Sequence, residues 1–249
     1  MVKNIMHSFI FIFILSATAF SQESDDAFLE NWVRTAQASK TYAFSLLILS
    51  SGFDDKTAPV PAKINKDDIE NTSYFQLLDS ASLIWDININ NEKVAKLTGR
   101  EMLEVLTDAK FFLFAPTSGP AVFAKRDTQG RITKMFTLKN STPFNWDKIL
   151  NQVQKKLGWD GVVLQAAENK FIVGAPADLL KEPDIQALAI AGSKDNDTLS
   201  KENRTGAGLL SLTKRFKGFA LFESIFVDES NKISAGTKLI IEKRKMTPP

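Results

Sequence analysis

The residue types that most often catalyse reactions or bind metals near neutral pH are scarce in this chain of 249 residues. It contains no cysteine, and its one histidine is His7. Histidine and cysteine supply most general bases, thiolate nucleophiles and zinc ligands. Without them, serine–histidine triads, cysteine nucleophiles, thiolate or imidazole zinc sites and disulfides are excluded. The side chains left for chemistry are Ser, Thr, Tyr, Lys and the carboxylates.

One spacing among these side chains matches a catalytic motif. Ser211 and Lys214 have the S-x-x-K spacing of penicillin-binding proteins, whose serine nucleophile and lysine lie one helical turn apart. The segment around them has the pattern of a strand, which places residues three apart on opposite faces. The triplet Arg204-Thr205-Gly206, similar to K-T-G, precedes the serine instead of following it, and the sequence has no S-D-N element. We therefore expect no acyl-enzyme chemistry.

Two short runs begin like a calcium-binding loop. Residues 86–90 supply its first three oxygen positions, but Asn91 stands where the loop needs glycine and Leu97 where it needs glutamate. Residues 195–197 fail in the same way, because Gly206 occupies the twelfth position. We expect solvated turns or strand faces at both, with at most a weak surface site formed by the two aspartates of the second.

The remaining candidates for chemistry are unspecific. Gly206 and Gly208 form a bare G-x-G, without the third glycine and the following helix of a nucleotide-binding fingerprint. Adjacent carboxylates at 54–55 and 67–68 lie in polar stretches, which favours solvated charge or helix capping over the spatially defined pair of a glycosidase. The sequence thus predicts no catalytic residue, no cofactor-binding residue and no metal ligand.

The first 21 residues have the layout of a secretory signal. A lysine precedes the unbroken apolar run at 9–15, and small residues then allow cleavage after Ala19 or after Ser21. The run is shorter than the roughly 20 residues that span a bilayer, so we expect a cleaved signal over 1–21. Cleavage would remove His7 and leave a mature chain with neither histidine nor cysteine.

The charge balance argues against nucleic acid as a partner. The chain has 31 Lys+Arg and 29 Asp+Glu, which gives no strong basic field. The basic clusters at 214–217 and 243–245 are short and fit solvated strand ends. No later apolar run is long enough to span a membrane. We expect a periplasmic chain without a transmembrane span, with extracellular release left open, and a bacterial host, because the chain is exported without disulfides.

Helical and strand patterns are mixed as far as residue 157. Helices are expected at 24–36, 67–78, 94–109 and 146–157, and strands at 42–49, 83–89, 111–115, 121–125 and 131–138. A continued helix is the alternative for 42–49. The last helix has the clearest signals, since Asn145 precedes it as a cap and Gly158 follows it.

Beyond Gly158 the pattern changes to short strands with glycine between them. They are expected at 162–166, 171–175, 185–191, 209–214, 219–227 and 237–242. The polar run at 192–206 is expected to be a mobile loop. The predicted fold is therefore α+β, with a mixed α/β domain over 22–157 followed by a small all-β barrel or sandwich over 158–245.

Residues 158–243 resemble small β-barrel modules of bacterial envelope proteins. The runs that carry the resemblance are VVLQAAENKFIVGAPADLL, QALAIAG, TGAGLLSLTKRFKGFALFESIF and ISAGTKLIIEK. They are similar in strand order, glycine-bounded turn and final strand to the C-terminal domain of the flagellar assembly protein T family, although the insertion at 192–206 departs from it. Residues 94–114 resemble the helix and strand of assembly proteins in curli secretion. The resemblance implies an assembly or adaptor role and carries over no site residues.

These observations favour a non-enzymatic structural or adaptor protein of the bacterial periplasm, in a flagellar or secretion-type envelope assembly with envelope proteins as partners. The alternative is a periplasmic carrier of a small ligand or lipid, with phenylalanine-rich strands around its pocket. A hydrolase that uses carboxylates or a Ser/Lys pair is the third hypothesis.

Overall fold

The computed structural model describes residues 27–78, 96–139, 145–182 and 184–243. The predicted signal at 1–21, the predicted cap at Ser24, the predicted strand at 83–89 and the calcium-like run at 86–90 lie outside these residues. The chain divides into two compact units, Met1–Ala38 and Ser39–Pro249. A helix over 27–43 crosses their boundary. No helix of the described residues is long and apolar enough to cross a bilayer.

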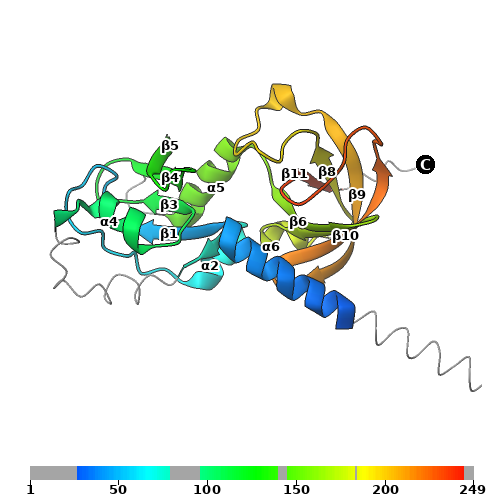
Figure 1. The fold of residues 1–249 in the computed structure, drawn as a ribbon, viewed down its shortest axis with the longest axis horizontal. Coiled ribbons are helices and arrows are strands. Elements are labelled where there is room, and N and C mark those ends of the chain that lie inside the picture. The colour runs from blue at the N-terminus through cyan, green and yellow to red at the C-terminus, as the bar shows by residue number, and fades with distance from the viewer. Residues whose placement is uncertain (1–26, 79–95, 140–144, 183, 244–249) are drawn as a thin grey trace, which may run out of the picture. The chain divides into compact units, whose positions relative to one another are not determined.

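The first sheet of the second unit has five strands in the order β2-β1-β3-β4-β5 (Figure 1). Its strands are β1 (Ser45–Leu49), β2 (Gln76–Leu77), β3 (Phe111–Phe114), β4 (Ala121–Arg126) and β5 (Ile132–Leu138). β1 runs parallel to β2 and β3, whereas β3, β4 and β5 form an antiparallel meander. All residues of β1 and β3 are buried, which explains why both read as continuous apolar runs instead of alternating ones.

The helices confirm some sequence boundaries and correct others. α5 (Trp146–Leu157) begins and ends as predicted, because Asn145 accepts a hydrogen bond from the Lys148 amide and Gly158 adopts a left-handed conformation with φ +76°. α2 (Lys66–Thr72) is shorter than the predicted 67–78. The Ser73 hydroxyl donates to the Ile69 carbonyl at 2.8 Å, and the extended backbone at Ser73 ends the helix.

α4 (Gly99–Leu106) is also shorter than the predicted 94–109. The helix begins after Thr98, whose amide donates to the Glu101 carboxylate at 2.7 Å. The backbone and side-chain hydrogen bonds from Thr98 lower the pKa of Glu101. Arg126, on β4, holds the other end of the helix. Its guanidinium donates to five carbonyls at 2.7–3.0 Å, those of Leu103, Glu104, Thr107, Ala109 and Gly130. It thereby satisfies carbonyls that the end of a helix leaves without partners.

The remaining strands form a closed antiparallel barrel in the order β10-β7-β6-β11-β8-β9, with β9 and β10 closing the ring. The strands are β6 (Gly161–Ala167), β7 (Lys170–Gly174), β8 (Ile185–Ile190), β9 (Gly206–Phe216), β10 (Phe219–Val227) and β11 (Lys238–Lys243). A short helix, α6 (Ala177–Leu180), joins β7 to β8. The predicted α+β fold class is thus confirmed, with a barrel in place of the alternative sandwich.

Apolar side chains from all six strands fill the inside of the barrel. The buried core there includes Val163, Phe171, Val173, Ala187, Leu210, Phe222 and Leu239. Closure of the sheet leaves no strand edge, and packing inside the barrel removes these apolar side chains from water.

Candidate functional site

The serine and lysine of the S-x-x-K motif lie on β9, in the strand that the sequence predicts. Ser211 lies opposite Gln186 on β8 and opposite Glu223 on β10. The Lys214 Nζ lies 5.7 Å from the centroid of the Phe216 ring. An extended segment does not give the one-turn spacing that serine–lysine chemistry uses. The geometry therefore does not favour acyl transfer at this motif.

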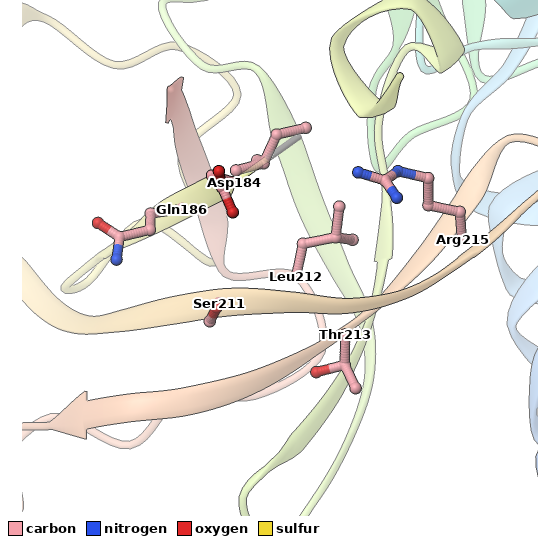
Figure 2. Close-up of a pocket in the computed structure, with 7 residues that line it drawn as sticks. Asp184, Gln186, Ser211, Leu212, Thr213 and Arg215 are labelled. Atoms are coloured by element: carbon pink, nitrogen blue, oxygen red, sulfur yellow. The ribbon is translucent and has the colours of Figure 1, made fainter. Parts of the chain in front are cut away.

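A shallow pocket of about 280 Å³ lies beside Ser211, between β8 and β9. Figure 2 shows its side chains, which point in different directions and do not converge on one position. Its cation, Arg215, donates to the carbonyls of Leu180 at 2.7 Å and Glu182 at 2.8 Å. Arg215 therefore serves to hold the segment that leads into β8.

The predicted carboxylate candidates are used for local structure. Asp55 accepts from the Gly52 amide at 2.6 Å, and Asp67 and Asp68 lie in the first turn of α2, where the helix dipole stabilises negative charge. Asp197, of the second calcium-like run, forms an ion pair with Lys125. Within the described ranges, no group of three or more Asp, Glu, His or Cys side chains gathers as a metal site.

Asp197 belongs to a contact that joins the 192–206 segment, the sheet and the barrel. The Trp159 indole donates to the Asp197 carbonyl at 2.9 Å and stacks on Tyr74 with 4.1 Å between ring centroids. The Tyr74 hydroxyl is buried and has no hydrogen-bond partner among the described residues, and burial raises the Tyr74 pKa. Tyr74 and Trp159 are both buried, so we assign this contact a structural role.

Lys40, near the end of the first helix, is a buried cation that the sequence analysis missed. Lys40 is 2 % exposed, and its Nζ lies 5.2 Å from the centroid of the Phe219 ring. Burial lowers the Lys40 pKa to about 8, and the nearby Glu70 offsets only part of that effect. A charged Lys40 therefore reduces the free energy of unfolding.

We expect the stability of the protein to rise with pH between about pH 8 and 10.5. The unfolded chain binds a proton at Lys40 in this window and the folded chain does not, so the free energy of unfolding increases by about 3 kcal/mol in full. Chemical denaturation across this pH range measures the slope. Lys40→Met should reduce this slope and stabilise the protein at pH 7, leaving the part due to Lys238, whose pKa is also lowered by burial, whereas Lys63→Met, at an exposed position, should keep the full slope. An unchanged slope in Lys40→Met would contradict this account.

A row of apolar side chains crosses the outside of the barrel and has no role in the contacts described so far. Phe226 on β10 is opposite Leu209 on β9, which is opposite Leu188 on β8, which is opposite Ile240 on β11. We call these four residues the apolar strip. Residues next to them in sequence, such as Leu210 and Leu239, face the core, so the strip faces outward.

Exposure is greatest where the strip begins on β10. Phe226 is 63 % exposed and Leu188 is 37 % exposed. Ile225, which is 54 % exposed, is the extra residue of a β-bulge between Ser224 and Phe226. The bulge adds a second apolar side chain to this end of the strip. Contiguous apolar side chains on a surface mark interaction sites more often than scattered ones.

Carboxylates border the strip on the described surface. The neighbouring outward row contains Glu223, Ser211, Gln186 and Glu242. On the other side, Asp228 follows β10 and accepts hydrogen bonds from Ser230 and Asn231, which lower its pKa and keep it charged. Two cations are near in register. Lys238 on β11 comes two residues before Ile240, but it is buried and its Nζ donates to the carbonyls of Lys194 and Gly236, and Lys170 lies opposite Glu223 on β7, outside the four strands of the strip. The strip is thus an apolar surface with an acidic border.

Sequence reasoning did not identify the strip, because its four residues come from four separate strands. The one local signal is the pair Ile225-Phe226, where two large apolar residues interrupt the alternation near the end of β10. Such a break is typical of a bulge.

Comparisons of this chain with protein-family models, with curated proteins and with solved structures found no match.

Proposed function

We propose that this protein is a non-enzymatic exported adaptor of a bacterial envelope assembly, of the flagellar or secretion type, and that it binds a partner protein in the periplasm through the apolar strip. The strip is the observation that carries the proposal. The predicted export signal supports it. The sequence also has no cysteine and no histidine beyond His7, so the residue types that most often catalyse reactions are missing, which favours a binding function.

The acidic border indicates what kind of partner fits. Two copies that met strip to strip would bring Glu223, Glu242 and Asp228 of each copy toward carboxylates of the other, which disfavours self-association. A different protein with an apolar face bordered by Lys or Arg would gain both burial and charge complementarity. We therefore expect a partner protein of this composition.

Photo-crosslinking in intact cells tests the proposal. A benzoylphenylalanine in place of Phe226 should give one defined crosslinked product with an envelope protein, identified by mass spectrometry. The matched control is the same substitution at Val105 on α4, which is 66 % exposed and lies away from the barrel strands. This control should give no such product.

Binding to the identified partner then has to depend on the strip. Phe226→Ser should raise the Kd about tenfold or more, with little change in Tm because the side chain is exposed, and Val105→Ser should leave the Kd unchanged. Crosslinks only to a second copy, equal products from both positions, or recovery of the free monomer alone would each contradict the proposal.

A further inference from the structure

A second, larger pocket lies where the end of α5 meets the barrel, and neither the motif search nor the proposed function uses it. Its volume is about 370 Å³, within the range of roughly 300–1,000 Å³ typical of small-molecule sites. Asn151, Gln154, Lys155 and Gly158 line one side of this junction pocket from one face of α5, because they are three or four residues apart. The apolar floor consists of Leu179 on α6 and Ile240 on β11.

Three cations line the junction pocket, and we call Lys155, Lys201 and Arg204 its basic rim. Neither lysine forms an ion pair or side-chain hydrogen bond with the described residues, and both are exposed. The pocket's one carboxylate is Asp160, which accepts from the Ile241 amide at 3.0 Å. Burial raises the Asp160 pKa. Positive charge therefore exceeds negative charge around the pocket.

Arg204 supplies a separate indication of a ligand. Its terminal nitrogen donates to the Gly158 carbonyl at 2.8 Å, which holds the guanidinium at the end of α5. Its Nε is buried and has no hydrogen-bond partner among the described residues. A buried N–H without an acceptor costs free energy, and an anion in the junction pocket would supply that acceptor.

We propose that the junction pocket binds a small organic anion, with its charged group at the basic rim and its apolar part on the apolar floor. Phosphate and carboxylate groups both satisfy this chemistry, since Arg and Lys bind either. A lipid-derived amphiphile and a soluble organic acid would share it. The site shares Ile240 with the apolar strip but does not involve Phe226, Leu209 or Leu188, so a variant of Phe226 tests the adaptor function without altering this pocket.

Calorimetric titration of the full chain tests the site with four probes: octyl phosphate, octanoate, inorganic phosphate and octyl glucoside. Octyl phosphate or octanoate should bind, and inorganic phosphate and octyl glucoside should bind at least about tenfold more weakly, because each lacks one half of the ligand. If octyl phosphate binds, butyl phosphate separates the two sources, since equal binding indicates a short soluble acid and weaker binding indicates a lipid-derived chain.

Charge variants give opposite expected signs. Lys155→Gln/Lys201→Gln should weaken octyl phosphate binding about tenfold. Asp160→Asn should tighten it roughly threefold or more, and its amide oxygen can still accept from Ile241. The matched control is Lys148→Gln/Lys156→Gln, which makes the same charge change on α5 at two exposed lysines that do not line the pocket, and it should leave the Kd unchanged.

Three results would overturn the proposal. They are no measurable binding of either amphiphile, equal affinity for octyl glucoside or inorganic phosphate, and equal effects of the two double lysine variants. A Tm of each variant close to that of the unmodified protein shows that a lost signal reflects binding and not unfolding.

Discussion

Arg126→Ala is expected to lower the free energy of unfolding by about 3–4 kcal/mol. Its guanidinium donates to five backbone carbonyls, which belong to the end of α4, the segment leading into β3 and the β4–β5 turn. A hydrogen bond from a charged donor contributes about 1.5–3 kcal/mol to stability. In the alanine variant, water can donate in place of the guanidinium only to those carbonyls that it can reach. The side chain also lies over the Phe112 ring at 5.4 Å. Urea denaturation followed by circular dichroism measures the loss.

Two variants separate the hydrogen bonds of Arg126 from its charge. Arg126→Lys keeps the charge but has three donors on a single nitrogen, so we expect it to recover less than half of the loss. Arg131→Ala removes a neighbouring exposed arginine whose side chain contacts no described hydrogen-bond partner, and it should change stability by less than about 0.5 kcal/mol. A loss below about 1 kcal/mol in Arg126→Ala would show that these bonds contribute little.

Gly158→Ala is expected to cost about 3 kcal/mol or more. Gly158 has φ +76°, and a Cβ there would lie 2.1 Å from the Leu199 carbonyl oxygen. A left-handed conformation alone costs an L residue about 1–2 kcal/mol. The clash is with backbone, so no side-chain rotation relieves it. The Leu199 amide also donates to the Leu157 carbonyl at 2.8 Å, and the substitution would break this contact between α5 and the 192–206 segment.

Gly130→Ala is the matched control for this prediction. Gly130 has φ +84°, and a Cβ there would meet no atom within 4 Å. Its loss should therefore be about 1 kcal/mol, from the conformation alone. The difference between the two variants measures the contact with Leu199. Equal losses in thermal or urea denaturation would mean that the 192–206 segment moves aside without cost.

Elements with local signals were predictable from the sequence. α5 has a capping asparagine, a helical period and a terminal glycine, and the S-x-x-K segment forms the strand that its pattern predicts. α2 and α4 were predicted too long, because Ser73 and Thr98 set their boundaries through hydrogen bonds that spacing does not show. Tyr74 and Phe75, which follow Ser73, are buried outside the helix.

The candidate site depends on pairing between distant strands, which the sequence does not specify. Leu188 and Ile240 are neighbours only because β8 and β11 pair in one register, and a shift of β11 by one residue would turn Ile240 inward. The junction pocket likewise needs α5, α6 and β11 together. The ion pair of Asp197 was likewise not predictable from residues 195–197, because its partner Lys125 is 72 residues away.

The position of β11 in the barrel has a consequence for synthesis, during which the chain emerges from its N-terminus. β11 pairs with β6 on one side and β8 on the other, so the ring stays open until its last strand arrives. Until then, two strand edges have unpaired backbone groups that can pair with other chains. A nascent chain at this stage is exposed to aggregation, and it is the form that a chaperone would need to protect.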